Sequence, residues 1–573
     1  MSSKTLDNQP QLFGHPIGLF VLFFTELWER FSYYGMRAIL VLYIYSSIEK
    51  GGLGWTKSEA LELYGWYTML VYVMSIPGGI LADKMLGQKK TVMLGGLLLV
   101  LGHSILAVEA MWAFYAGLGL IILGVGCLKP NISTMVGGLY KKGDPRRDSG
   151  FTIFYIGINI GAFLSALIVG YVGEKIGWHY GFGLAGIGML IGQAVYMWGQ
   201  KYLVGVGDYL GTSSAEDQAL MKKPLTKIEK DRMIVLFLSF LIIIVFWGAF
   251  EQAGGLLNIY AKEKTDLTIA FLGTTIPASW FQSVNALFII IFGTTVAGYW
   301  IRQKRRGKEV SSLFKMAIGT IIMGSGFLLM AGASNQAGGE AYGKASMWWL
   351  VGAYLLHTIG ELCASPVALS FITKLAPVKY GAIMMGVYFA ATGIGNKLAG
   401  TIGEASQAEA VEINLIASPA EVTPYLSADT LIAMDMDFVL KANIYKEGDK
   451  VFMINNQEGG AKDFSNFISL DAKAQGILAG MLADENATKD NQQHAIIRLS
   501  KDVEAKKVKA NTGDGKNYSG TVEIFEVQNK REFKTFLFIT ALTVFFGLLI
   551  IVFLKKLKVL THGAEEIEMD TTH

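Results

Sequence analysis

Long apolar segments alternate with short polar loops along most of the chain. Twelve of these segments are long enough to cross a bilayer as helices, which takes about 20 apolar residues each. They span residues 16–47, 61–82, 91–110, 112–138, 149–172, 179–200, 232–260, 277–301, 311–334, 346–372, 380–403 and 533–555, with ends placed to within a few residues. The pattern therefore predicts an all-α polytopic membrane protein with twelve transmembrane helices.

Two polar stretches interrupt this pattern. Residues 201–231 read as a linker between two six-helix halves. Residues 405–531 hold no apolar run that could span, and apolar and polar residues alternate in Lys450-Val-Phe-Met-Ile and Gly520-Thr-Val-Glu-Ile-Phe-Glu-Val, which is the period of a strand. With Glu447-Gly448-Asp449 as a turn, the second stretch favours a small β-containing domain over a disordered linker.

The predicted domains follow from these breaks. They are a six-helix bundle at 1–200, a linker at 201–231, helices seven to eleven of a second bundle at 232–404, an insertion domain at 405–531, a twelfth helix at 532–556 and a tail at 557–573.

Basic residues concentrate in the loops on one side of the predicted membrane. Those loops carry Lys84, Lys89, Lys90, Lys141, Lys142, Arg146, Arg147, Arg302, Lys304, Arg305, Arg306, Lys308, Lys374 and Lys379, whereas the opposite loops carry few, such as Lys175, Lys262 and Lys264. Because loops rich in Lys and Arg stay in the cytoplasm, we expect an inner (plasma) membrane protein with both termini and the linker cytoplasmic. The insertion would then be extracytoplasmic.

The composition narrows the class further. Of the 573 residues, 52% are hydrophobic and only 17% are charged, which argues against a soluble enzyme. The net charge is only +3, so we see no nucleic-acid footprint. Cys127 and Cys363 both fall in apolar segments, which argues against a disulfide framework. The polar first dozen residues show no cleavage site, and we expect no signal peptide.

Four charges lie inside the first apolar segment, between Glu26 and Arg37. Charges near the bilayer centre cost from a few to more than about ten kcal/mol, so they usually line a cavity and carry function. The spacing places six residues on one polar stripe of a helix: Glu26, Glu29, Arg30, Tyr33, Tyr34 and Arg37. A partly structural role is the alternative for Glu26 and Arg30, which lie one turn apart and can neutralise each other.

Several motifs make the fold more specific. Gly79-Ile-Leu-Ala-Asp83-Lys84-Met-Leu-Gly87-Gln-Lys89-Lys90 resembles the cytoplasmic loop signature of the major facilitator superfamily. Six elements resemble the proton-dependent oligopeptide transporter family of that superfamily: Glu26-x-x-Glu29-Arg30-Phe31, Lys129-Pro130-Asn131, Phe154-Tyr155-Ile-Gly-Ile-Asn159-Ile-Gly161, Phe250-Glu251-Gln252, Trp280-Phe281-Gln282-Ser283-Val284-Asn285 and Glu361-x-x-x-Ser365-Pro366. They cover both helical halves but not the insertion. The resemblance implies proton-coupled import of di- and tripeptides.

The residue chemistry suits such a substrate. A short peptide at neutral pH is a zwitterion, so its site needs a positive pole, a negative pole and amides between them. An arginine fork matches a carboxylate in a way that lysine does not. If the poles lie on opposite halves, a bound zwitterion draws the halves together. The predicted positive pole is Arg30, Arg37 and Lys129, the negative pole is Glu251 and Glu361, and the amides are Asn159 and Asn285.

The resemblance extends this set to aromatic and hydroxyl side chains. The predicted substrate-binding residues are Arg30, Tyr33, Tyr34, Arg37, Tyr72, Lys129, Asn159, Trp247, Asn285, Glu361, Ser365 and Tyr388. The predicted proton-coupling and gating residues are Glu26, Glu29, Arg30, Arg37, Lys129, Glu251 and Glu361.

Some of these residues also have simpler explanations. Tyr72 and Trp247 could be ordinary packing aromatics, and Asn159 an interhelical hydrogen bond. Lys129 could snorkel, although it lies well before the Lys141 cluster. Tyr388 departs from the family, because many members have tryptophan there, which leaves the pocket shape open.

Two further departures concern proton coupling. Gly65 stands where the animal relatives carry a histidine, so coupling cannot rest on that imidazole, and Phe250 stands where some bacterial members have a second acid. His357 lies one turn before Glu361 and could compensate, but we expect it to be packed and neutral.

We therefore expect a transporter, not an enzyme, without metal or cofactor, that uses protons as the coupling ion. Its expected partners are di- and tripeptides and the bilayer, with no nucleic acid. One alternative is a related symporter of another small anion or zwitterion, such as nitrate or an amino-acid conjugate. Another is a membrane receptor or scaffold acting through the insertion. An enzyme in the insertion is weaker, because no nucleophile–base pair or metal spacing stands out there.

Overall fold

The computed structural model describes most of the chain. The described residues are 10–141, 144, 146–209, 224–270, 273–308, 310–339, 344–377, 380–407, 411–417, 438–447, 450–455, 462–463, 493–499, 518–528 and 531–564. The chain forms two compact units: a helical unit (Met1–Ala333, Lys344–Ala405 and Phe536–His573) and a second unit (Ser334–Gly343 and Ser406–Thr535).

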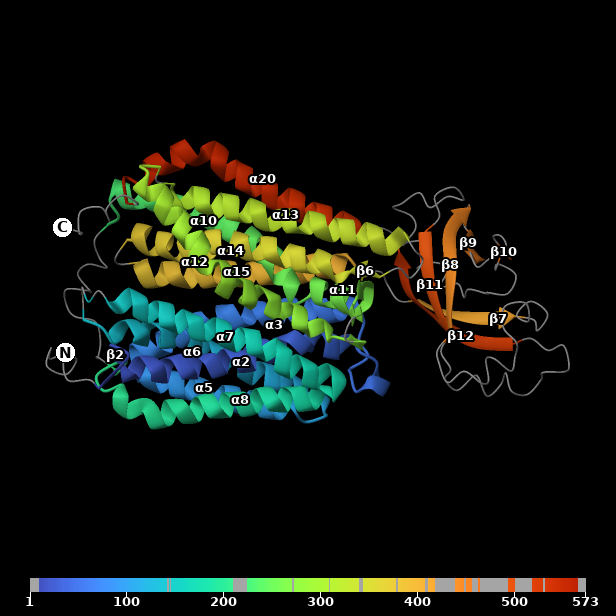
Figure 1. Cartoon of the computed structure of the whole chain (residues 1–573), viewed down its shortest axis with the longest axis horizontal. Helices are drawn as coiled ribbons and strands as arrows, with labels where there is room; N and C mark the ends of the chain where they lie inside the picture. The colour runs from blue at the N-terminus through green and yellow to red at the C-terminus, as the bar shows by residue number, and fades with distance from the viewer. Residues whose placement is uncertain are drawn as a thin grey trace. The chain divides into compact units, whose positions relative to one another are not determined.

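Within the described residues, twelve helical rods run alongside one another, six from each half of the chain (Figure 1). The first half contains α2 (Ile17–Tyr45), α3 (Lys57–Val73) continued by α4 (Ser75–Leu81) and the π-helical turn η2 (Ala82–Leu86), α5 (Gln88–Leu106), α6 (Met111–Gly138), α7 (Arg146–Lys175) and α8 (Trp178–Gly199). The second half contains α10 (Lys227–Phe250) continued by η4 (Glu251–Ala253) and α11 (Leu256–Lys264), then α12 (Phe281–Arg305), α13 (Ser312–Gly339), α14 (Met347–Leu375), α15 (Gly381–Ala405) and α20 (Arg531–Leu560). Short 3-10 turns are η1 (Ile48–Lys50), η3 (Gln200–Tyr202) and η6 (Ala278–Trp280).

Ten helical stretches of the described chain are long and apolar enough to cross a membrane. The two remaining rods are α2, which carries four charges, and α15, which is rich in glycine and carries Asn396 and Lys397. Their polar residues lower the apolar content without shortening the helix. The predicted all-α polytopic fold is confirmed, and each rod lies within a few residues of a predicted segment.

Two predicted helices are broken in the structure. The segment predicted at 61–82 is interrupted at Met74, between α3 and α4. The segment predicted at 232–260 ends at Phe250, and the chain passes through η4 before α11 begins. Gly254 and Gly255 lie at this second break, and Gly255 has φ −105° and ψ −100°, outside the helical region. An apolar pattern does not reveal such breaks, because both sides of each break remain apolar.

The helical unit has two ends, the linker end and the α11 end. At the linker end, α8 ends and α10 begins. The segment before α2 contacts α7 there, and the segment after α20 contacts α10. There the Arg146 guanidinium donates to the Gly14 carbonyl (3.0 Å), and Arg232 donates to the Thr561 carbonyl (3.0 Å). At the α11 end, α2 and α7 end, and α3 and α12 begin. The start of α2 and the end of α20 therefore lie at the same end of the bundle.

A loop at the linker end carries the superfamily signature. Gly87 (φ 79°) precedes α5 as its N-cap, without a side-chain cap. A Cβ at Gly87 would come within 2.6 Å of the Tyr209 backbone nitrogen. The Tyr209 hydroxyl donates to the Lys84 carbonyl (3.0 Å), and the Lys89 N–H donates to the Gly207 carbonyl (2.9 Å). The loop is thereby fastened to the segment that follows α8. Residues 210–223 of the predicted linker lie outside the described residues.

At the linker end, Asp144 forms hydrogen bonds with the first residue of α7, Arg146. The Asp144 carboxylate accepts from the Arg146 backbone N–H (2.9 Å) and from its guanidinium (3.1 and 2.8 Å). These charge-assisted hydrogen bonds lower the pKa of Asp144 to about 2. Asp144 therefore stays ionised at the helix N-terminus, where negative charge is favoured.

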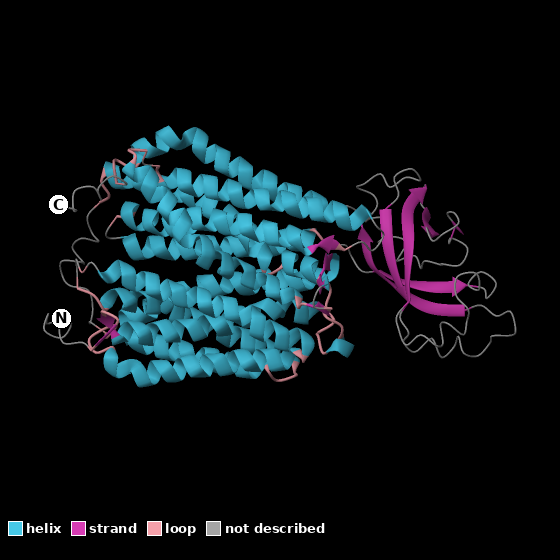
Figure 2. Ribbon diagram, in the orientation of Figure 1, coloured by secondary structure: helices cyan, strands magenta, loops and turns pink. Residues whose placement is uncertain are grey.

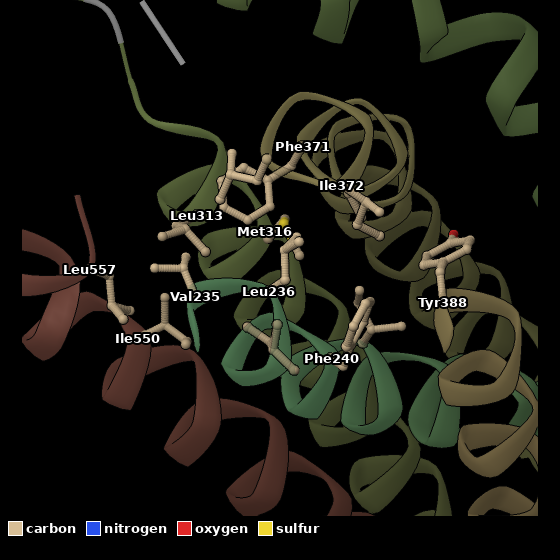
Figure 3. Close-up of a cluster of buried hydrophobic side chains, with 14 of the residues drawn as sticks. Val235, Leu236, Phe240, Leu313, Met316, Phe371, Ile372, Tyr388, Ile550 and Leu557 are labelled. Atoms are coloured by element: carbon tan, nitrogen blue, oxygen red, sulfur yellow. The ribbon is translucent and has the colours of Figure 1, made fainter. Parts of the chain in front are cut away.

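The second half is held by a cluster of buried apolar side chains between α10, α13, α14, α15 and α20 (Figure 3). Val235 and Leu236 of α10 face Leu313 and Met316 of α13, and Phe371 of α14 closes the cluster. Lipid is as apolar as these side chains, so close packing rather than the hydrophobic effect holds such helices together.

The second unit contains a six-stranded sheet (Figure 2). Its strands are β7 (Val411–Ala417), β8 (Phe438–Glu447), β9 (Lys450–Asn455), β10 (Lys462–Asp463), β11 (Gln493–Leu499) and β12 (Tyr518–Gln528), in the order β10-β9-β8-β11-β12-β7 with every pair antiparallel. β9 and β12 coincide with the two predicted strands. Glu447 pairs with Lys450, which agrees with the predicted hairpin, whereas Gly448 and Asp449 lie outside the described residues. The extracytoplasmic position predicted for this second unit stays a prediction.

Three further two-stranded pairs are small. They are β1 (Gln11–Leu12) with β2 (His15–Pro16), β3 (Thr265–Asp266) with β6 (Ala345–Ser346), and β4 (Thr268–Ile269) with β5 (Thr274–Thr275).

α4 approaches α6 closely because Gly78 has no side chain and Pro130 has no backbone N–H. Pro130 has no N–H to donate to the Gly126 carbonyl one turn earlier. That carbonyl lies against Gly78, where an added Cβ would come within 2.0 Å of it. The Asn131 amide donates to the Cys127 carbonyl (2.7 Å) and to the Gly78 carbonyl (3.4 Å). This contact sets the position of α6 and therefore of Lys129.

We expect Gly78→Ala to destabilise the purified protein by about 1–3 kcal/mol, because the new methyl group collides with backbone that cannot rotate away. Gly79→Ala is the matched control, since no atom lies within 4 Å of a Cβ there. Thermal unfolding in detergent measures both variants. Equal melting temperatures would contradict the close approach of α4 to α6.

Candidate functional site

The polar stripe of α2 places three charges in the interior of the helical unit. Arg30 Nε lies 3.0 Å from Glu26 Oε1, and Arg30 also pairs with Glu29. All three side chains are at most 4% exposed. An unpaired buried charge would cost several kcal/mol, so mutual pairing is what permits this burial. The pairing of Glu26 with Arg30 at one-turn spacing is present in the structure.

Lys129 joins this group from α6. Its Nζ lies 3.7 Å from the centre of the Tyr72 ring of α3, a cation–π contact, and its charge acts on Glu26, Glu29 and Arg30. Lys129 therefore faces the polar interior, as the cavity interpretation predicts. When Glu26, Glu29, Arg30 and Lys129 are all ionised, the net charge of this group is zero.

The predicted tyrosines of α2 lie against the cations. The Arg30 guanidinium carbon is 5.7 Å from the Tyr33 ring centre and 5.6 Å from that of Tyr34, and the Arg37 guanidinium is 4.8 Å from Tyr34. The aromatic faces stabilise these cations without neutralising them.

Arg37 connects the two halves of the chain. Its Nη1 donates to Glu251 Oε1 at 2.8 Å, and the Tyr64 hydroxyl donates to the same oxygen at 2.5 Å. Glu251 is 4% exposed and belongs to η4, so the helix break in the second half delivers this carboxylate to α2 and α3. A Cβ at Gly254 would come within 1.9 Å of the Tyr64 hydroxyl oxygen. Glycine at that position is what lets Tyr64 reach Glu251.

Glu361 lies in a separate polar contact within the second half. Its Oε2 accepts from the Asn285 amide at 2.9 Å, and the same amide nitrogen donates to the Thr358 hydroxyl at 3.0 Å. Two predicted residues, one from α12 and one from α14, are thereby brought together. In this state Asn285 binds Glu361.

Trp247, Ser365 and Tyr388 line one small cavity of the second half, together with Phe246, Met316 and other side chains. Tyr388 of α15 is 8% exposed and belongs to the apolar cluster between α10, α13, α14, α15 and α20 (Figure 3). The Trp247 side chain contacts Phe246 and Phe250. These three residues therefore lie together around one cavity.

Asn159 donates to the Tyr155 carbonyl of its own helix at 2.9 Å. The interhelical hydrogen bond considered as an alternative is therefore not the contact it makes in this structure. A buried amide that bonds within its own helix can change partner at little cost, and its predicted role in binding stays a prediction.

The structure explains the residues at the two positions considered for histidine-based proton coupling, Gly65 and His357. A Cβ at Gly65 would come within 3.0 Å of the Gly400 Cα, because α3 and α15 pack closely there. His357 is 1% exposed and packs against Phe327, with ring centres 4.7 Å apart. Neither of its ring nitrogens has a hydrogen-bond partner among the described groups. This surrounding suits a packed, neutral imidazole.

Additional contacts that the sequence did not predict join the halves at the α11 end. Lys262 of α11 pairs with Glu174 of α7 (2.7 Å), and the Ser279 N–H donates to the same carboxylate (2.8 Å). The next residue of α11, Glu263, pairs with Lys57 of α3. The spacing of these charges along the chain gives no signal, because each pair joins helices far apart in sequence.

Neutral hydrogen bonds reinforce this junction. They run from Asn258 and Gln282 to the Ala38 carbonyl (2.8 and 3.3 Å), from Trp280 to the Leu167 carbonyl (3.0 Å) and from Ser283 to the Phe163 carbonyl (2.8 Å). The structure therefore represents a state in which the two halves are joined at the α11 end.

A sequence model of the POT family matches residues 89–205 and 212–416, which is more than half of the chain. The chain belongs to the POT family. A di-/tripeptide transporter of Lactococcus lactis subsp. cremoris is 36% identical over 444 residues, covering 67% of this chain and 88% of that protein. The peptide transporter YePEPT of Yersinia enterocolitica is 33% identical over 473 residues, covering 72% and 92%. The uncharacterized transporter YclF of Bacillus subtilis is 40% identical over 430 residues, covering 66% and 86%.

Solved structures of POT transporters have the same fold. A POT peptide transporter in complex with alafosfalin superposes with a TM-score of 0.64 at 37% identity, covering 69% of this chain and 90% of that one. A POT family transporter in complex with a thioalcohol-conjugated peptide gives 0.64 at 33% identity, covering 70% and 93%. POT membership and the twelve rods together confirm the predicted major facilitator fold. Residues beyond 416 lie outside the range that the family model matches.

We expect Gly254→Ala to displace the Tyr64 hydroxyl and to lower the melting temperature of the protein in detergent. In a Tyr64→Phe background the same substitution should cost much less, because the atom closest to the new methyl group is absent. The difference between the two backgrounds, measured as a double-mutant cycle, reports the contact itself. Additive effects would show that Gly254 acts through backbone freedom alone.

Proposed function

We propose that this protein is a proton-coupled symporter that imports di- and tripeptides across the inner (plasma) membrane by alternating access. The observation that carries the proposal is the placement of opposite charge on the two halves, with Arg30, Arg37 and Lys129 on one and Glu251 and Glu361 on the other. Two POT relatives are a di-/tripeptide transporter and a peptide transporter, and a solved POT structure holds a peptide conjugate.

A peptide can replace contacts that already exist between the halves. Its carboxylate would compete with Glu251 for the Arg37 guanidinium, and its ammonium would compete with the Asn285 amide for Glu361. Because both termini and the backbone are common to all short peptides, such a site does not depend strongly on side chains. Ligand binding then favours one arrangement of the halves by as much as its affinity for the two arrangements differs.

Orientation follows from charge and from the shared end of the terminal helices. The linker end carries the basic loops, so we assign it to the cytoplasm, and the α11 end to the opposite side. The state described here is then closed toward the outside by the Arg37–Glu251 pair and the α11 contacts. Import requires that these contacts break once in each cycle.

The proposal is tested with labelled dipeptide in proteoliposomes under an imposed membrane potential. We expect free dipeptides to compete and C-terminally amidated dipeptides to compete poorly. Arg37→Lys keeps the charge but loses the fork, and we expect it to weaken dipeptide binding by roughly tenfold or more, because a charge-assisted hydrogen bond is worth about 1.5–3 kcal/mol. Equal competition by amidated peptide would overturn the carboxylate assignment. Competition by nitrate or by a single amino-acid conjugate, but not by dipeptide, would favour a different substrate.

Glu29→Gln separates binding from energy coupling. One proton crossing about 100 mV brings roughly 2.3 kcal/mol, and about 1.4 kcal/mol is tenfold, so that potential can concentrate a neutral dipeptide roughly fortyfold. A permanently neutral side chain at residue 29 should preserve exchange of labelled for unlabelled dipeptide but abolish this accumulation. Glu26→Gln is the companion variant, because one of the two acids can be structural. If both single variants and the double variant still accumulate dipeptide like the parent, Glu251 and Glu361 become the candidates for proton carriage.

A further inference from the structure

The polar interior contains two charged layers, and Tyr67 lies between them on α3. The Arg37 layer consists of Arg37, Glu251 and Tyr64, joined through Glu251 Oε1. The Glu29 layer consists of Glu26, Glu29, Arg30, Lys129 and Tyr72. Since α2 and α3 run in opposite directions, the step from Arg37 down to Glu29 on one helix corresponds to the step from Tyr64 to Tyr72 on the other.

Helix geometry sets the depth of Tyr67 within this span. It is three residues after Tyr64 and five before Tyr72, which at about 1.5 Å per residue is roughly 4.5 Å below one layer and 7.5 Å above the other. Its charge interactions confirm this position, because the phenol lies within electrostatic range of both Arg37 and Glu29. Tyr67 is therefore an α3 side chain that lies between the two layers.

The hydroxyl of Tyr67 has no protein partner that explains its burial. The side chain is 2% exposed, and its oxygen has no hydrogen-bond partner among the described protein groups. Glu29 Oε1, Arg30 Nη2 and Arg37 Nε are likewise buried and without a hydrogen-bond partner among those groups. Buried polar groups of this kind are normally satisfied by bound water. Orphaned polar atoms thus extend from one layer to the other on both sides of Tyr67.

We propose that Tyr67 is a proton-relay residue which, through water bound at its hydroxyl, passes protons between Glu251 in the Arg37 layer and Glu29 in the Glu29 layer. The inference rests on the proposed proton-coupled transport. In each transfer the phenol oxygen accepts a proton from the water on the Glu251 side while its own proton leaves toward Glu29. One proton moves, no net charge remains on the ring, and the hydroxyl returns by rotation.

A phenol is chemically suited to this place. A hydroxyl can donate and accept at the same time, whereas the ammonium and guanidinium groups around it can only donate. The groups that face Tyr67 are Glu29, Tyr33 and Arg37 from α2 and Tyr64 from its own helix, with Glu251 of η4 joined to Tyr64. Arg37 is already paired with Glu251. A neutral relay between the layers therefore adds no uncompensated charge.

The test is Tyr67→Phe in the full-length protein, reconstituted in liposomes with labelled dipeptide. The substitution keeps the ring and removes one oxygen. We expect exchange of labelled for unlabelled dipeptide and dipeptide affinity to stay unchanged, while the initial rate of potential-driven uptake falls by about tenfold or more, as for loss of a positioned proton-transfer group. The acceleration of uptake by external acidification should be lost with it. A purely structural role would not separate exchange from proton-driven uptake.

Tyr196→Phe is the matched control. Tyr196 is equally buried, but its hydroxyl donates to the Lys89 carbonyl at 2.9 Å, at the linker end. That variant should lose stability and keep its proton dependence, whereas Tyr67→Phe removes a hydroxyl that has no partner among the described protein groups and should not lower the melting temperature. If Tyr67→Phe takes up dipeptide with the rate and pH dependence of the parent, the relay is wrong. If the unmodified protein itself shows no proton-driven dipeptide uptake, the proposed function fails, and the relay fails with it.

Discussion

Every charge buried in the helical unit has to be neutralised by another part of the chain, and this requirement organises the site. α2 carries Glu26, Glu29, Arg30 and Arg37 into the bundle. The first three neutralise one another with help from Lys129, but Arg37 is left over, and its partner is Glu251 from the other half. An unpaired buried guanidinium would be strongly destabilising, so the pair ties the position of the second half to that of α2.

Because the position of the second half depends on the Arg37–Glu251 pair, breaking this pair can change how the two halves are arranged. The same Glu251 oxygen accepts from Arg37 and from Tyr64, so anything that takes Arg37 away, or that protonates Glu251, weakens two contacts between the halves at once. The α11 contacts lie on the same end and would have to yield in the same movement. A small ligand with a carboxylate can therefore compete for an interaction that holds the halves together, which is how local chemistry becomes a large rearrangement.

Backbone details decide whether these side chains can meet. The break at Glu251 turns the carboxylate toward α2, and the absence of a side chain at Gly254 leaves room for the Tyr64 hydroxyl. On the other side of the site, the Gly126 carbonyl that Pro130 leaves without its helical donor lies against Gly78 and sets α6, which carries Lys129. The glycines and proline that interrupt these helices thus determine the geometry of the charged residues beside them.

The sequence by itself determined the elements and the faces they present. Apolar segments of spanning length predicted the twelve rods, the spacing from Glu26 to Arg37 predicted one polar face on α2, and alternation predicted strands at Lys450 and Gly520, because such patterns depend only on neighbouring residues. Only the tertiary structure decided that Arg37 pairs with Glu251, that Asn285 binds Glu361, that Tyr388 joins an apolar cluster, and that Tyr64 and Tyr67 belong to the polar interior. These outcomes depend on where distant helices cross, and the crossings are set by close backbone contacts at glycines and by helix breaks that leave the hydrophobic pattern unchanged.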